Sequence, residues 1–238
     1  MSSQPELVRA GSPSAEPPAI SRGDFIKATY SHLAIAVLGF AALSTLFMSS
    51  GLSMAMLAAL GKSQFIWLAV LGAFMLVGWY ATSLADKATT YKSQLLGLVI
   101  YVLAESLIFA PMLALASRVA PSAIGSAAVV TLALVGGLTF TAFTSKSDFS
   151  FLGGILKIGG FVALGLIVAA ILFGFNLGVW FSGAMILFAA GAVLYDTAQI
   201  IHHYPTDRPA GAALHLFASI ALLFWYVLRL LMQLANDR

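Results

Sequence analysis

The chain has 238 residues, of which 61% are hydrophobic and 9% are charged, and its formal net charge is +3. Soluble domains carry about 25% charged residues, so this composition predicts an integral membrane protein in contact with the lipid bilayer. The lack of cysteine excludes disulfides, thiol catalysis and cysteine-based zinc sites, and the scattered lysines and arginines form no basic stripe of the kind that binds nucleic acid.

The first 26 residues combine four prolines with serine, alanine and glutamate. Such a segment cannot bury enough apolar surface to fold, so residues 1–26 are predicted to form a disordered tail. The first apolar segment lies too far from the start, and is too long, for the apolar region of a signal peptide. We therefore expect it to stay in the membrane as the first helix of a single domain over residues 27–238.

Seven segments are apolar enough, over about 20 residues, to cross a bilayer as helices. They are 29–49, 65–85, 93–117, 122–144, 149–173, 177–201 and 211–234. Short connections with glycine, proline, serine or asparagine separate them, and the residue alternation of a membrane β-barrel is absent. The predicted fold is an all-α bundle of seven transmembrane helices.

The distribution of lysine and arginine predicts the orientation of this bundle, because cytoplasmic loops carry an excess of them. With a cytoplasmic N-terminus, the basic residues near helix ends divide seven to three in favour of the inner side. The inner set is Arg9, Arg22, Lys27, Lys87, Lys92, Lys146 and Arg208, and the outer set is Lys62, Arg118 and Arg238. We expect the C-terminus to lie outside.

Four ionisable residues fall within the predicted spans: Glu105, Lys157, Asp196 and Arg229. Such residues are expensive in lipid and normally face a bundle interior or water. At 1.5 Å per residue, Asp196 lies roughly 8 Å and Lys157 roughly 12 Å from the inner ends of their helices. Glu105 lies roughly 18 Å and Arg229 roughly 27 Å from the same side.

These depths predict which groups can meet Asp196. Ser219 lies at roughly 12 Å and His215 at roughly 6 Å, so Asp196 is expected to meet Ser219, His215 or Lys157. Burial and nearby charges both change the pKa of a carboxylate. One interpretation makes Asp196 a proton-sensitive switch at the inner mouth of a cation path. The alternative is a structural carboxylate held by hydrogen bonds.

Glu105 is the acid within reach of Arg229 or Lys157. Either basic side chain can instead extend to the membrane surface, Arg229 to the outer and Lys157 to the inner headgroups. Glu105 can also be a protonated glutamate bonded to a backbone carbonyl. The sequence contains no serine triad, P-loop or zinc-protease motif, so we predict no enzyme activity, no cofactor and no metal site.

Two stretches of the sequence are similar to motifs of a known protein family. The first, 139–154, reads TFTAFTSKSDFSFLGG, and the second, 194–205, reads LYDTAQIIHHYP and continues in ALHLFASI at 213–220 and LRLL at 228–231. Over residues 27–235 the chain resembles the Bax inhibitor-1 family of seven-helix membrane proteins. The serine in the last helix makes it similar to the bacterial branch that includes modulators of a membrane-anchored ATP-dependent protease.

The resemblance implies a pH-sensitive calcium leak gated by two aspartates, or a role in cell-death suppression and stress protection. Asp196 matches the aspartate of the sixth helix and Arg229 matches a family arginine, but Ser219 stands where the second aspartate is expected. Two close carboxylates share a proton, and Ser219 removes that mechanism. It also weakens the case for calcium, which binds several oxygen ligands.

The expected function is therefore a pH-sensitive leak for calcium or another cation, or a stress-protection factor. Its expected location is the bacterial inner membrane. The alternative function is an interaction protein that modulates a membrane-anchored protease.

Overall fold

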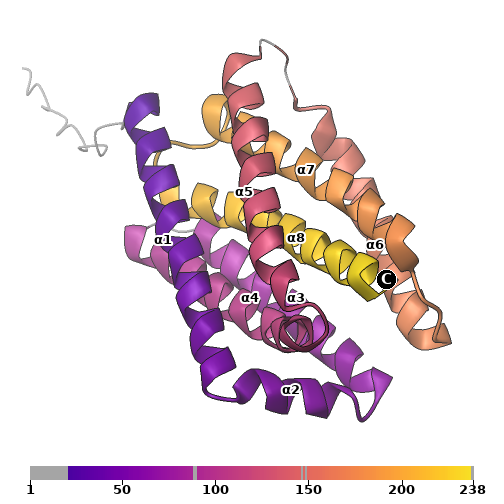
Figure 1. The fold of residues 1–238 in the computed structure, drawn as a ribbon. Helices are drawn as coiled ribbons and strands as arrows, with labels where there is room; N and C mark the ends of the chain where they lie inside the picture. The colour runs from indigo at the N-terminus through magenta and orange to yellow at the C-terminus, as the bar shows by residue number, and fades with distance from the viewer. Residues whose placement is uncertain (1–20, 88–89, 146, 148, 237–238) are drawn as a thin grey trace, which may run out of the picture.

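The structure is a computed structural model, and it describes residues 21–87, 90–145, 147 and 149–236. Within these ranges all regular structure is helical, in eight helices (Figure 1). They are α1 (Arg22–Ser49), α2 (Leu52–Leu60), α3 (Gln64–Asp86), α4 (Tyr91–Val119), α5 (Pro121–Thr144), α6 (Leu152–Phe173), α7 (Gly178–His202) and α8 (Pro209–Asn236). All except α2 are long and apolar enough to cross a membrane. The predicted all-α architecture with seven spans is confirmed.

Helix α1 begins earlier than the sequence suggests. Its N-cap is Ser21, whose hydroxyl oxygen accepts a hydrogen bond from the Asp24 backbone N–H at 3.2 Å. Phe25 is fully buried and stacks on Tyr204 with ring centroids 6.2 Å apart. Residues 22–26, expected to belong to the tail, are therefore helical, and the rest of that predicted tail, residues 1–20, lies outside the described residues.

The connection between the first two spans contains the additional helix α2. Its nine residues reach only about 14 Å, too short to cross a bilayer. Gly51 precedes it with a positive φ of 79°, a conformation that glycine adopts without strain. α2 packs mainly on α4, and so covers the end of the bundle away from the start of α1.

Helix α8 forms the centre of the bundle. It packs against α7, α1, α4, α5 and α3, and α8 and α4 are the two most buried of the spans. Figure 1 shows α8 crossing the molecule behind α5. Aromatic rings surround it, with Phe40 and Phe109 5.0 Å apart and Phe109 and Trp225 4.9 Å apart. Polar residues on α8 therefore enter an interior rather than lipid.

Helices α3 and α4 approach closely near the end where α3 stops. A Cβ added to Gly97 of α4 would lie 2.6 Å from the carbonyl oxygen of Ala81 and 3.1 Å from the Cβ of Ala85. Small residues at such positions let helix backbones touch. This contact fixes the end of α3, and with it Asp86, against the bundle.

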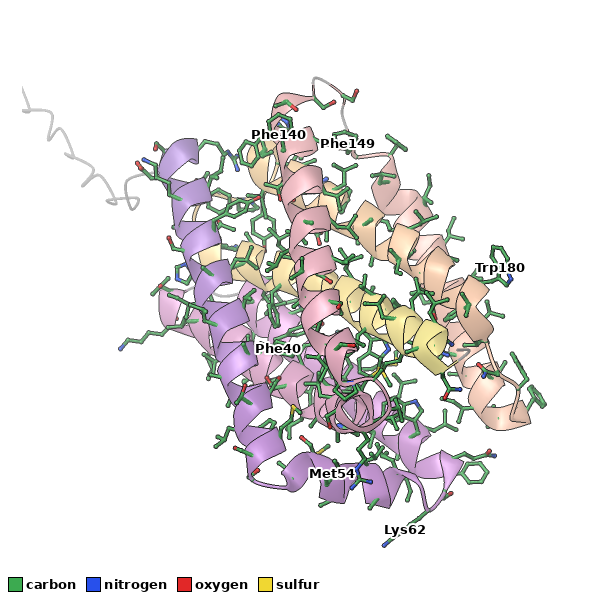
Figure 2. The ribbon with its side chains drawn as sticks, viewed as in Figure 1. Phe40, Met54, Lys62, Phe140, Phe149 and Trp180 are labelled. Carbon is green, nitrogen blue, oxygen red and sulfur yellow. The ribbon has the colours of Figure 1, made fainter. Side chains whose placement is uncertain are left out.

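We call one end of the bundle the basic end: α1, α4, α6 and α8 begin there, and α3, α5 and α7 end there. Side chains tie these termini together, since Arg22 bonds to Tyr204 and Gln94 bonds to Asp207. The described basic residues at this end are Arg22, Lys27, Lys87, Lys92 and Arg208. Lys62 lies at the opposite end (Figure 2). The direction of the bundle across the membrane stays a prediction.

Candidate functional site

The end of α7 is held by an arginine from α1. One guanidinium nitrogen of Arg22 donates to the carbonyl oxygens of Tyr204, at 2.5 Å, and Ile200, at 3.4 Å. The last carbonyls of a helix lack partners within it and carry partial negative charge, so a cation stabilises them. Pro205 then lies in the loop after α7, and Pro209 is the first residue of α8.

Asp196 lies between one and two turns before the end of α7 at His202, about 9 Å along the helix. The Ser219 hydroxyl of α8 donates to Asp196 Oδ2 at 2.5 Å. Such a short O–H···O⁻ bond is typical of a charge-assisted interaction. The structure thus brings together Asp196 and Ser219, the first of the partners expected from helix depth.

A cavity of about 210 Å³ opens beside this pair. Its polar lining comes from three elements. Helix α7 contributes Tyr195, Asp196 and Gln199, the loop after it contributes Tyr204, and α8 contributes His215. Asp196 is the carboxylate among these lining residues. The cavity therefore offers one carboxyl group and several other hydrogen-bonding groups, an arrangement that can attract a hydrated cation when the carboxyl group is ionised.

His215 lines the same cavity, but its hydrogen bond goes elsewhere. Its Nε2 lies 3.0 Å from both carboxylate oxygens of Asp86, the last residue of α3, and donates to them. The Tyr204 hydroxyl donates to Asp86 Oδ1 at 2.9 Å, and the Arg208 guanidinium donates to the Asp86 backbone carbonyl. Burial, followed by the negative charge of Asp86, raises the pKa of Tyr204, so this hydroxyl stays a donor. We call Asp86, Tyr204, Arg208 and His215 the loop clamp.

Three members of the loop clamp were missed by the sequence reasoning: Asp86, Tyr204 and Arg208. One signal was available. Asp86 ends a helix, where the partial negative charge of the helix terminus disfavours a carboxylate unless cations or donors surround it. The identity of those partners depends on how α3 meets the loop between α7 and α8, which spacing along the chain does not give.

Glu105 and Arg229 line a second, deeper cavity of about 190 Å³. Glu105 is only 6% exposed and lies about 21 Å along α4 from the basic end. Trp225 and Tyr226 of α8 and Trp67 of α3 complete its aromatic walls. The two residues share a cavity, as their depths suggested, although no ion pair between them is found among the described residues.

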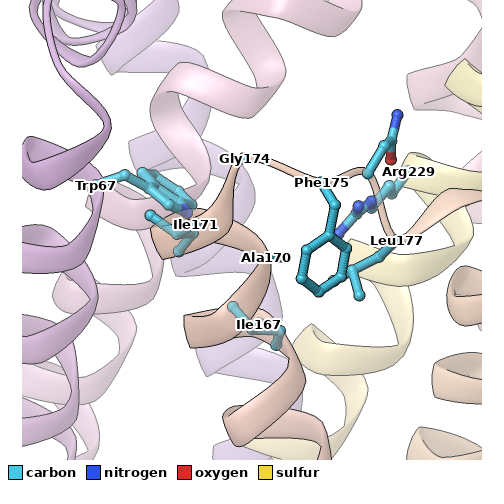
Figure 3. Close-up of a pocket in the computed structure, with 9 residues that line it drawn as sticks. Trp67, Ile167, Ala170, Ile171, Gly174, Phe175, Leu177 and Arg229 are labelled. Carbon is cyan, nitrogen blue, oxygen red and sulfur yellow. The ribbon is translucent and has the colours of Figure 1, made fainter.

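Arg229 also reaches a third cavity, of about 320 Å³, at the end opposite the basic end. Figure 3 shows its guanidinium beside Phe175 and Leu177 of the connection between α6 and α7, with Trp67 across the end of α6. Asn176 belongs to the same lining. Arg229 thus lines both the deep cavity and the cavity at the end opposite the basic end.

Lys157 lies on an exposed face of α6. None of the ion pairs found in the described part of the chain includes it, and it lines neither the Asp196 cavity nor the Glu105 cavity. Among the described residues, no group of three or more histidines, aspartates or glutamates is placed to hold a metal ion.

The bundle has seven helices that are long and apolar enough to cross a membrane, and it contains two cavities that ionisable side chains line. These features define a multi-pass membrane protein. The family model "Inhibitor of apoptosis-promoting Bax1" matches residues 22–236, which is most of the chain. The protein therefore belongs to the Bax inhibitor-1 family.

Three relatives illustrate the similarity. An uncharacterized Pseudomonas aeruginosa protein is 33% identical over 46% of this chain and 49% of its own length. Bax inhibitor 1 of Schizosaccharomyces pombe is 32% identical over 47% of this chain and 42% of its own. An Arabidopsis thaliana BI1-like protein is 35% identical over 45% of this chain and 44% of its own. The chain thus spans less than half the length of each of these relatives.

Proposed function

We propose that the protein is a cation leak of the membrane whose conductance depends on the protonation of Asp196. The observation that carries the proposal is the Asp196 carboxylate, which accepts a hydrogen bond from Ser219 and lines a cavity at the basic end. When ionised, this carboxylate attracts a cation into the cavity. When protonated, it is neutral, and the attraction is lost.

The groups around Asp196 set its response to pH. His215 of α8 and Tyr204 of the loop line the same cavity, and Asp86, Arg208 and Arg22 lie one contact further away. A charged His215 close to Asp196 favours its ionised form, whereas Asp86 competes for that histidine. The titratable groups at the basic end are therefore coupled, and the pH dependence of the leak is a property of these groups together and not of Asp196 alone.

The rest of the path is proposed to run along α8 to the cavity of Glu105 and Arg229. Leu216 and Phe217 of α8 are almost fully buried, and they lie along the helix between His215 of the first cavity and Leu222 of the second. Hydrophobic constrictions of this kind close a pore by excluding water. We propose that the conformation described is the closed one and that opening moves α8 relative to α4 or α7.

The ion is proposed to be weakly selected. Calcium takes six to eight oxygen ligands, typically including several carboxylates, whereas the cavity lining contributes Asp196 alone as an acid. Calcium and other cations are both expected to pass. The proposed location is a bacterial inner membrane with the basic end in the cytoplasm, supported by the basic residues of that end and by the Pseudomonas relative.

Reconstitution into liposomes tests the proposal. Liposomes loaded with a calcium indicator, or with a potassium indicator in a parallel series, are diluted into the ion over a range of pH. We expect the wild-type leak to vary with pH and the Asp196→Asn leak to be lower and nearly constant. The matched control is Asp207→Asn, because Asp207 is a carboxylate of the same end whose side chain is 66% exposed.

Ser219 favours a second proposal, that the protein modulates a membrane-anchored protease. A serine beside Asp196 cannot form the shared-proton pair of two carboxylates, and a pH-independent protein can still act by binding a partner. Deleting residues 1–20 and following the turnover of membrane-protease substrates tests this function. Unchanged turnover, together with no co-purifying protease, would count against it.

A further inference from the structure

A cavity of about 280 Å³ lies between α1 and α5 and shares no lining residue with the Asp196 cavity. α8 forms its floor through Phe217 and Phe224, and Phe40 of α1 forms part of one wall; Figure 2 labels Phe40 in the space between α1 and α5. α1 and α5 make no direct backbone approach in the described structure. Ala41, Thr45 and Leu132 at the rim are exposed, so the cavity opens sideways, toward the lipid.

Two buried hydroxyls in this lining have no hydrogen-bond partner in the part of the chain that the structure describes. Ser44 of α1 is 6% exposed and Thr131 of α5 is 3% exposed, and neither side-chain oxygen is bonded. Hydroxyls in membrane helices commonly donate to a carbonyl of the preceding turn. Thr45 does so to Ala41, and Thr141 to Gly137, both at 2.8 Å. Ser44 and Thr131 are thus left free to donate to something else.

The lining indicates the chemistry of the missing partner. None of the residues around the cavity is charged, and all except Ser44, Thr45 and Thr131 are apolar. An unpaired hydroxyl in an apolar setting is destabilising, and each of these two hydroxyls is a donor that an uncharged acceptor can satisfy. The expected ligand is therefore a hydrocarbon chain that carries a neutral acceptor such as a carbonyl.

The depth of the two hydroxyls narrows the ligand further. Ser44 lies about 8 Å from the end of α1, and Thr131 about 15 Å from the start of α5, both measured from the end opposite the basic end. The hydrocarbon core is about 30 Å thick, so both hydroxyls lie within the leaflet on that side. Lipids of that leaflet present ester carbonyls followed by acyl chains.

We propose that this cavity is a lipid-binding site for one acyl chain of a glycerophospholipid from the leaflet opposite the basic end. The chain enters between α1 and α5 and lies on Phe217 and Phe224, and the acyl-ester carbonyl at its outer end accepts a hydrogen bond from Ser44, the hydroxyl nearer the membrane surface. The charged headgroup stays outside the rim. The site shares no lining residue with the Asp196 cavity, but its floor residue Phe217 also belongs to the constriction of the proposed path, so the site is tested by lipid binding and not by the leak.

Photo-crosslinking tests the site. The full chain is reconstituted in nanodiscs that contain a phosphatidylethanolamine with a diazirine in one acyl chain, and labelled peptides are mapped by mass spectrometry. We expect labels concentrated on cavity-lining residues of α1, α5 and α8, and their loss in Ala128→Phe, which fills the cavity from α5. The matched control is Ala133→Phe, on an exposed part of the same helix, which should label like wild type.

A second variant keeps the test decisive if Ala128→Phe fails to fold. The double variant Ser44→Ala/Thr131→Val removes both donors with little change in volume, and Thr45→Val is its control. Loss of the Ser44 hydrogen bond should weaken lipid binding about two- to tenfold, measured by native mass spectrometry with added phosphatidylethanolamine. Uniform labelling of every lipid-facing helix, or equal affinity of the double variant and Thr45→Val, would overturn the proposal.

Discussion

Replacing Asp86 with alanine is expected to loosen the loop clamp at the basic end. The Asp86 carboxylate accepts hydrogen bonds from Tyr204 at 2.9 Å and from His215 at 3.0 Å, and both disappear in Asp86→Ala. The bond from Arg208 goes to the backbone carbonyl of Asp86, so it does not depend on the side chain. The variant therefore isolates the two side-chain bonds.

The magnitude follows from these two bonds and from the exposure of the carboxylate. A hydrogen bond to a charged group contributes about 1.5–3 kcal/mol to stability. The Asp86 side chain is 40% exposed, and water compensates part of the loss at an exposed site. We therefore expect a total loss of about 2 kcal/mol. For a protein of this size, that loss lowers the melting temperature by about 4–8 °C.

Tryptophan fluorescence during heating in detergent micelles, at one fixed scan rate, measures the effect. Asp86→Asn should fall between wild type and Asp86→Ala, because an amide oxygen can still accept from Tyr204. Asp207→Ala is the control, since that exposed carboxylate pairs with its neighbour Arg208 at 3.3 Å, a contact of little value at a surface. If Asp86→Ala and Asp207→Ala melt within about 1 °C of each other, the loop clamp does not stabilise the fold.

Three further variants test other parts of the account. Gly97→Ala should lower the free energy of unfolding by about 1–3 kcal/mol through overpacking, because the added Cβ would lie 2.6 Å from the Ala81 carbonyl oxygen. In the control Gly136→Ala, the added Cβ meets no atom within 4 Å, so this variant should melt no lower than wild type. The pKa of Tyr204 is raised by burial and by Asp86, so its stabilising hydrogen bond is fully present below the ordinary tyrosine value of about 10 and is lost as pH rises toward the higher value in the folded protein. Above a pH of about 10, the melting temperature of wild type should thus fall more steeply with pH than that of Tyr204→Phe. Parallel curves of melting temperature against pH would contradict this. Lys157→Gln should leave the liposome leak unchanged, since Lys157 lies on an exposed face of α6; a changed pH profile would place it in the path.

The spans could be predicted from the sequence because the bilayer imposes a length on every apolar helix. The same rule does not apply to α2, whose nine residues lie at the end of the bundle, so that helix was missed. The early start of α1 was missed as well. Its signal is a local one, a capping serine with an aspartate three residues later, followed by the buried Phe25.

The meeting of Asp196 with Ser219 could be anticipated because both helices are measured from the same membrane surface and rise by a fixed amount per residue. Depth along the helices does not by itself predict which of several residues at similar depth forms the hydrogen bond. His215 lies at a suitable depth for Asp196, yet its imidazole donates to Asp86. That choice depends on the close packing of α3 on α4 and on the path of the loop before α8, which are tertiary features.

The leak of Asp196→Asn liposomes, compared with wild type and Asp207→Asn over a range of pH, tests the central proposal most directly. The substitution keeps an acceptor for Ser219 but removes the negative charge from the cavity. The account predicts a pH-dependent leak in wild type and Asp207→Asn, and a lower, nearly pH-independent leak in Asp196→Asn. Equal leaks for all three proteins at every pH would contradict it.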